Sequence, residues 1–144
     1  MVLYVHQYQV AVVHVKRIMP KAYSYIVARD YGFAPNPFYA ILTLATCKPM
    51  IRKTAKVGDF IIGCSNKANG NKLIYMAKVS EILTFDQYWN DPRFAKKKPV
   101  MNGSLKKLYG DNIYHHDANG NWIQEDSHHT HNDGTTNKYN LERD

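Results

Sequence analysis

The chain has 144 residues, which is the length of one domain rather than of several. Lysine and arginine outnumber aspartate and glutamate by 19 to 12, and the net charge of +7 favours a polyanionic partner such as nucleic acid. No run approaches the roughly 18 apolar residues needed to cross a membrane, so an integral membrane protein is not expected. Eleven tyrosines suit base-stacking surfaces, but tyrosine is also a good strand former, so both interpretations stay open.

The cysteines and the N-terminal segment argue against a secreted protein. Cys47 and Cys64 lie far apart without CxxC spacing. This argues against a structural zinc site and a disulfide-built secreted domain, and it favours a reducing cytoplasm. Residues 1–19 lack the basic start and unbroken apolar run of a signal peptide. Residues 1–18 are expected to be an N-terminal extension or an added strand, because 10–15 is rich in valine.

The first elements predicted after this segment are two strands, a stiff loop and a short helix. Residues 23–28 are β-prone and lead into a loop over 29–38, whose two prolines restrict the backbone. Residues 39–45 are apolar on both faces and predict a buried second strand. Pro49 suits the first turn of a helix over 50–56, which has one apolar face and one basic face.

Two further strands follow this helix. Residues 60–65 predict the third strand, in which Gly63 indicates a bulge or a close approach to the backbone. An Asn-Gly pair within 66–71 is typical of a hairpin turn. It leads into a fourth and longest strand over 73–83.

The rest of the sequence predicts short helices and one hairpin. Residues 84–87, TFDQ, fit a capping box that opens a helix, and 105–109 predict one more helical turn. The stretches 112–115 and 121–124 flank an Asp-Ala-Asn-Gly turn and predict a second hairpin. Residues 125–144 are polar and rich in histidine, and this composition alone predicts disorder.

Several long motifs resemble one known family. DYGFAPNPF, TLATCKPMIRKTAKVGDFIIG, YWNDPRF, KKPVMNGSLKKLYGDNIYHH and WIQEDSHH resemble the nucleotide modification associated domain family, type 2, over residues 19–144. The resemblance implies an association with nucleic-acid base modification and with mobile elements or phages. It also implies that residues 125–144 lead toward a further strand, so this His-rich tail is either disordered or the truncated end of the domain.

The order of elements is also distantly similar to the PUA-like domains of the EVE, ASCH and YTH group. These are small barrels that bind nucleic acids and often grip one modified base. The expected fold is therefore an α+β domain, a small mixed or antiparallel PUA-like β-barrel with short helices. Residues 19–124 are expected to form this single domain.

The first candidate site is a basic surface on the helix predicted over 50–56. Phosphate contacts need cations placed along a surface. Such cations are present at Lys48, Arg52, Lys53 and Lys56, with the basic loop 96–98 as an extension. The alternative is an ordinary solvated helix face.

The second candidate site is a base pocket at the ends of two predicted strands. A flipped base needs stacking rings together with donors and acceptors for its edge. The residues that would supply them are Arg29, Asp30, Tyr31, Phe33, Ser65 and Asn66. The alternative is that Arg29 and Asp30 cap a turn while Phe33 plugs the end of the barrel.

The third candidate site is a polar set near the end of the sequence, which consists of Asp111, Asn112, Tyr114, Asp126, Ser127, His128 and His129. A serine, a histidine and carboxylates are the parts of a nucleophilic triad, and here they would be Asp111, Asp126, Ser127 and His128. Adjacent residues do not usually supply triad geometry, because triads are assembled across a fold. A metal site of His128 and His131 with a nearby aspartate is one alternative, and a solvated or partner-dependent tail is the other.

The sequence therefore predicts a nucleic-acid or nucleotide binding domain that grips one base. The rival interpretations are an enzyme acting on a modified base or nucleotide, and a non-catalytic protein-interaction module. No GxGxxG or Walker motif occurs, so no cofactor of those classes is expected, and no metal is expected either. The sequence carries no indication of the oligomeric state.

Overall fold

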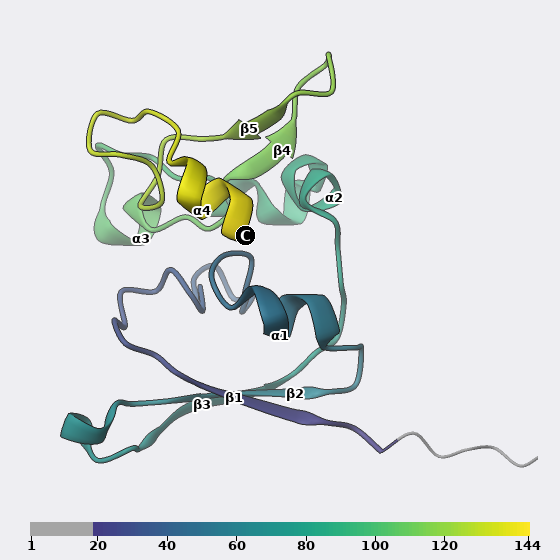
Figure 1. Cartoon of the computed structure of the whole chain (residues 1–144), viewed down its shortest axis with the longest axis vertical. Helices are drawn as coiled ribbons and strands as arrows, with labels where there is room; N and C mark the ends of the chain where they lie inside the picture. The colour runs from purple at the N-terminus through teal and green to yellow at the C-terminus, as the bar shows by residue number, and fades with distance from the viewer. Residues whose placement is uncertain (1–18) are drawn as a thin grey trace, which may run out of the picture.

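Three strands form the larger sheet, in the order β1–β2–β3 (Figure 1). β1 (Ala22–Ile26) is parallel to β2 (Phe60–Cys64), which is antiparallel to β3 (Leu73–Lys78). These strands confirm three of the predicted ones, although β3 ends before the expected residue 83. The structure is a computed structural model that describes residues 19–144, and the extension or strand expected at 1–18 lies outside the described residues.

One face of this sheet is covered by α1 (Pro49–Thr54), which begins at a proline as predicted (Figure 1). Ile51 and Ala55 pack against the buried Tyr25 and Ile61 of the sheet. Removal of these apolar surfaces from water holds the helix on the strands.

The pairing of β2 with β3 is irregular near the end of β2, where the register shifts between Gly63 and Cys64. The ring of Tyr75 lies directly against Gly63, and a Cβ atom there would clash with it. The Tyr75 hydroxyl donates to the Tyr25 hydroxyl at 2.9 Å. The bulge and the close approach that the sequence offered as alternatives are both present.

The strand predicted at 39–45 is wrong. Tyr39 and Ala40 each have a φ of 62°, which turns the chain back, and one isolated bridge joins Asn36 to Thr43. The apolar side chains of this stretch predict burial on both faces of a strand. They line a cleft instead, and none of residues 39–45 is fully buried.

The second half of the chain lies on the other side of α1 from the sheet (Figure 1). It contains α2 (Phe85–Asn90), the 3-10 helix η2 (Pro92–Lys97), α3 (Leu105–Leu108), the hairpin of β4 (Tyr114–His116) and β5 (Trp122–Gln124), and α4 (Lys138–Arg143). A short 3-10 helix, η1 (Lys67–Asn69), joins β2 to β3. The capping box is confirmed, because the side chains of Thr84 and Gln87 each accept from the other's backbone. The second hairpin is confirmed as well.

A second core holds this half together. Phe33, Ile113 and Tyr114 are buried there, and Phe85 and Trp122 pack against them. Phe33 comes from the loop after β1, so the first half of the chain contributes to the core of the second. This contact fixes the loop over 29–38 between the two halves.

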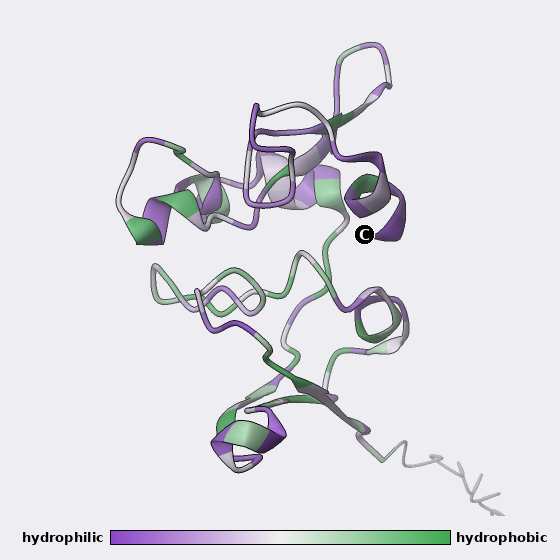
Figure 2. Cartoon of the chain, turned by 60° about the vertical axis from the view of Figure 1, so that its left-hand side comes forward, coloured by the Kyte–Doolittle hydropathy of each residue, from purple (hydrophilic) through white to green (hydrophobic). Residues whose placement is uncertain are grey.

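Residues 125–144 are folded, so the disorder predicted from their composition is wrong. Ser127 is 3% exposed and His129 is 6% exposed. The amide groups of Gln124 and Asn140 donate to the carbonyl oxygen of His129 at 3.4 and 2.8 Å. Hydrogen bonds thus anchor a segment that has few apolar side chains, as the mostly polar ribbon near the C label in Figure 2 illustrates.

The described residues 19–144 form a mixed α+β domain with two small sheets and short helices, but no closed barrel. The β1–β3 sheet and the β4–β5 hairpin share no ladder, and no strand forms where the second was expected. The expected PUA-like barrel is therefore not confirmed. Within 19–144, every helix is too short or too polar to cross a bilayer.

Candidate functional site

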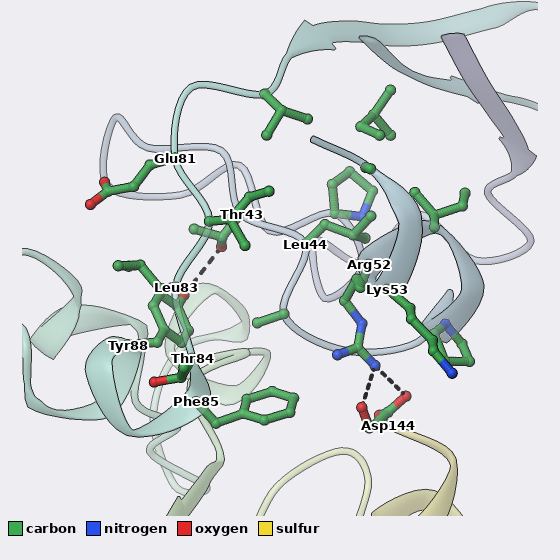
Figure 3. A pocket seen from close by; sticks show the side chains of 18 of the residues that line it. Thr43, Leu44, Arg52, Lys53, Glu81, Leu83, Thr84, Phe85, Tyr88 and Asp144 are labelled. Atoms are coloured by element: carbon green, nitrogen blue, oxygen red, sulfur yellow. Dashed lines mark hydrogen bonds and ion pairs between the residues drawn. The ribbon is translucent and has the colours of Figure 1, made fainter. Parts of the chain in front are cut away.

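A cleft of about 880 Å³ lies between the α1 side of the domain and the segment that leads into α2 (Figure 3). Its lining is mostly apolar. Arg52 and Lys53 stand on one wall, and Leu83 and Phe85 stand on another (Figure 3). Asp144 lies close to Arg52 at the margin of the cleft, so the end of α4 completes this wall.

Arg52 is the cation that joins α1 to the end of α4. Its guanidinium donates to the carbonyl oxygen of Asp144 at 2.9 Å and to its carboxylate at 3.2 Å. It also donates to the carbonyl oxygen of Cys47 at 2.7 Å. The Asp144 side chain is fully buried and that of Arg52 is 16% exposed. Arg52 is therefore mainly occupied within the protein, and the predicted role in phosphate binding is limited to its exposed edge.

The carboxylate of Asp144 also binds a buried histidine. Its Oδ2 lies 2.9 Å from Nδ1 of His129, and the Tyr114 hydroxyl lies 3.2 Å from both atoms. Burial alone would raise the pKa of Asp144, but the hydrogen bond and charge of His129 and the charges of Arg52 and Arg143 lower it to about 2. The carboxylate is thus held ionised beside the imidazole.

The other nitrogen of the His129 ring faces a thiol. Nε2 lies 3.4 Å from Sγ of Cys47, and the guanidinium of Arg143 lies 3.9 Å from the same sulfur. Burial lowers the pKa of His129, but its hydrogen bonds to Asp144 and Cys47 outweigh burial and raise the pKa above its usual range. Cys47, His129 and Asp144 therefore form a continuous chain of contacts from sulfur to carboxylate.

Three local features bring these residues together. Cys47 directly precedes the left-handed Lys48 and α1, and its own φ is 55°. His129 follows β5 in a turn where its N–H donates to the Ser127 hydroxyl at 3.2 Å. Asp144 caps the end of α4, with its N–H on the carbonyl of Asn140. Cys47 remains partly exposed, whereas the histidine and the aspartate side chain are buried.

Aromatic rings lie beside the contacts that join Cys47, His129 and Asp144. The Tyr31 ring stacks on Tyr109 at 5.3 Å, and Phe33 lies edge-on to His128 at 5.3 Å and to His129 at 4.6 Å. Tyr31 and His128 are exposed. Burial lowers the pKa of His128, and the charges of His129 and Arg29 lower it further. We call Tyr31, Phe33, Tyr109 and His128 the aromatic rim.

The residues predicted for a base pocket occupy different places. Arg29, Asp30 and Tyr31 are exposed on the loop after β1, whereas Phe33 is buried in the second core. Ser65 is buried, and its hydroxyl binds the carbonyl of Asn69 and the N–H of Lys72 within the turn after β2.

The side chain of Asn66 caps η1 in the same turn. Ser65 and Asn66, which follow β2 directly, therefore have hydrogen-bond partners within the turn between β2 and β3.

The lysines predicted to contact phosphate also differ in exposure and in their contacts. Lys53 and Lys56 are exposed. Lys48 donates to the carbonyl oxygen of Ile26 at 3.3 Å, and its ammonium lies 4.7 Å from the centre of the Tyr25 ring. Among residues 19–144, these cations thus form no single stripe along α1.

Asp111 lies away from the other predicted catalytic residues. Its carboxylate is fully buried and accepts from the hydroxyls of Thr43 at 2.7 Å and Tyr88 at 2.8 Å. Burial raises its pKa, which these hydrogen bonds and the charge of Lys97 oppose. The structure therefore places Asp111 in a buried network under the cleft.

Asp126, Ser127 and His128 form one turn. Thr130 donates to the carboxylate of Asp126 at 3.0 Å, and Ser127 accepts from the N–H of His129. Their side chains do not converge as a triad. No group of three or more metal-ligating side chains is present in the part of the chain that is described.

The sequence does not single out Cys47 or Asp144, and it names His129 only as a member of the late polar set, not as a catalytic residue. Two signals were available, because Cys47 stands in the TLATCKPM motif and His129 is the second histidine of DSHH. The choice between the adjacent histidines depends on which one the turn directs inward, and that is not visible in the sequence.

Comparison with known proteins gives one match. The model of the family described as nucleotide modification associated domain 2 matches residues 19–144. No match was found among curated proteins or solved structures. The match covers the whole described domain, including the motifs that carry Cys47, His129 and the cleft wall. The chain therefore belongs to the nucleotide modification associated domain 2 family.

Proposed function

We propose that the cleft binds a nucleotide, free or within a nucleic acid, in a system that makes, reads or removes modified bases. The single observation that carries this proposal is the cleft of about 880 Å³ with Lys53 and Arg52 on one wall and Phe85 on another. Clefts of roughly 300–1,000 Å³ with apolar walls and a few polar groups are the usual sites for small ligands. The description of the family, nucleotide modification associated domain 2, supports a nucleotide as the class of ligand.

The two walls suit the two ends of a nucleotide. Lys53 is exposed at the cleft and its ammonium is a suitable contact for phosphate oxygens. The guanidinium of Arg52 lies 5.5 Å from the centre of the Phe85 ring, so a cation and an aromatic face are adjacent. A base that packs on Phe85 and Leu83 would leave its phosphate near Lys53.

Calorimetry with nucleoside monophosphates, triphosphates and short single-stranded oligonucleotides, with and without modified bases, tests the proposal. Binding is expected to weaken at least fivefold in Lys53→Ala and to fall between 50 and 200 mM salt. Lys56→Ala is the matched control, because Lys56 is exposed near the same helix but does not line the cleft. Equal losses in both variants, or no binding by the folded wild type, would overturn the proposal.

The chain of contacts from Cys47 to Asp144 points to a second function of a different class. These contacts support catalysis, whereas the cleft supports binding.

A further inference from the structure

We propose that Cys47, His129 and Asp144 form a catalytic triad with a thiol nucleophile. The triad hydrolyses the bond that joins an acyl or amidino carbon to a nucleobase. Cys47 is the nucleophile, His129 is the general base and acid, and Asp144 orients the imidazole. This activity goes beyond ligand binding in the cleft, and its first test does not depend on that binding.

The order of the contacts carries the proposal. A carboxylate on one imidazole nitrogen and a nucleophile on the other is the arrangement that activates a thiol. Here the Asp144 carboxylate lies 2.9 Å from Nδ1 and the Cys47 sulfur lies 3.4 Å from Nε2. Asp144 holds the proton on Nδ1, so Nε2 faces the thiol as the acceptor of its proton.

Two arginines and a tyrosine lie against these three residues. Arg143 approaches the Cys47 sulfur at 3.9 Å and Nε2 of His129 at 3.5 Å. Arg52 neutralises Asp144 from the other side at 3.2 Å, and the Tyr114 hydroxyl completes the polar contacts of the imidazole.

The position of Cys47 differs from that of a cysteine that only fills space. Cys47 packs against the core of Phe33, Ile113 and Tyr114, but it stays partly exposed, whereas a cysteine that only packs is normally among the most buried residues. Its φ of 55° is uncommon for a residue other than glycine, and such conformations cluster at functional sites. Cys64 has neither an imidazole contact nor a positive φ in the described structure, although it is also partly exposed.

The aromatic rim defines the substrate class. Phe33 packs against both His128 and His129, and Tyr31 stacks on Tyr109 nearby. Tyr31 and His128 are exposed, whereas Phe33 lies buried behind them, and exposed rings bind a planar heterocycle by stacking. Arg29 is exposed on the same loop as Tyr31 and can contact the attached phosphate. A nucleobase on this rim would carry its substituent toward Cys47.

The reaction needs only water as a second reactant. The Cys47 thiol gives its proton to His129, and the sulfur forms a bond to the electrophilic carbon. The bond from that carbon to the leaving nitrogen or oxygen breaks as His129 returns the proton to it. Water then attacks the thioester or thioimidate, gives a proton to His129, and the carbon–sulfur bond breaks to restore the thiol.

The first experiment compares the two cysteines within one chain. Native protein is treated with iodoacetamide at pH 6.5, and the alkylation of Cys47 and Cys64 is followed by peptide mass spectrometry. Urea-unfolded protein supplies the intrinsic rate of each thiol. Cys47 is expected to react at least tenfold faster than Cys64 in the native protein, and His129→Gln is expected to remove most of that difference.

Similar native rates for both cysteines would overturn the proposal. If His129→Gln does not fold, the more conservative Asp144→Asn replaces it, and its Cys47 rate is expected to fall at least threefold while that of Cys64 stays unchanged. An unchanged Cys47 rate in the folded variant would also contradict the proposed role of the imidazole.

The second experiment tests the substrate class. N-acylated and amidino-substituted nucleosides are incubated with the protein, and an adduct on Cys47 is sought by intact mass spectrometry. Cys64→Ser is expected to form the adduct and release the hydrolysed nucleoside, whereas Cys47→Ser forms neither. A highly reactive Cys47 with no adduct from any member of the panel would overturn the substrate class. Nucleotide binding that depends on Lys53 would be unaffected by either result.

Discussion

The guanidinium of Arg52 contacts Asp144, which lies 92 residues away in the chain, through both the main-chain carbonyl and the side-chain carboxylate. One partner belongs to the helix that covers the three-stranded sheet, and the other ends the last helix (Figure 1). The pair therefore links the two halves of the domain at the margin of the cleft. It also fixes the carboxylate that orients His129.

Arg52→Ala is expected to destabilise the protein by about 2 kcal/mol, because it removes the guanidinium hydrogen bonds to the buried Asp144, while Arg143 and His129 stay beside the carboxylate. Urea unfolding followed by circular dichroism measures this loss. Lys53→Ala is the control on the same helix, because Lys53 is exposed, and its effect should stay within about 0.5 kcal/mol. Equal effects of the two substitutions would mean that the pair does not hold the halves together.

The lowered pKa of Asp144 predicts that part of the protein's stability is lost in acid. Its pKa of about 2 in the folded state is below the unfolded value, so its contribution is present above pH 4 and is lost as the pH falls toward 2. The loss is expected to be about 1–2 kcal/mol, since one pKa unit corresponds to about 1.4 kcal/mol.

Comparison of wild type with Asp144→Asn between pH 5 and pH 2.5 isolates this contribution, because other carboxylates titrate in both proteins. The difference in unfolding free energy between the two proteins should shrink as the pH falls. A constant difference would contradict the lowered pKa.

The features that the sequence predicted correctly depend on residues close together in the chain. The capping box needs only Thr84 and Gln87, and the second hairpin needs only its turn. Cys47 and His129 are 82 residues apart, and their contact depends on how two turns are oriented in space. The strand wrongly predicted at 39–45 also depends on contacts that are distant in the sequence, because apolar residues that line a cleft have the same pattern as those of a buried strand.

Gly63→Ala is expected to destabilise the protein by about 2–3 kcal/mol through overpacking, because its methyl group would meet the ring of Tyr75 and the side chain of Val27. Thermal or urea unfolding measures the change. Gly120→Ala is the control, since its Cβ would meet nothing within 4 Å and its φ of 79° costs about 1 kcal/mol. A smaller loss of unfolding free energy in Gly63→Ala than in Gly120→Ala would mean that β2 and β3 can move apart for the added methyl group at no cost in stability.

Lys97 is a buried cation whose removal should have an effect that depends on pH. Its side chain binds carbonyl oxygens of the loop before the cleft, those of Asn36 at 2.9 Å and Ile41, and the residue is 1% exposed. Lys97→Met removes these hydrogen bonds and is expected to cost about 2 kcal/mol at pH 7.5.

The pH dependence follows from burial, which lowers the pKa of Lys97 to about 8 although the charge of Asp111 opposes the shift. Between pH 8 and pH 10 the unfolded chain therefore binds more protons at Lys97 than the folded protein, so wild-type stability rises with pH. Urea unfolding at pH 7.5 and 9.5 should show the difference between wild type and Lys97→Met growing by about 1–2 kcal/mol. A difference that stays the same or shrinks would show that the ammonium keeps its ordinary pKa, and that the loop under the cleft is held by a permanent charge.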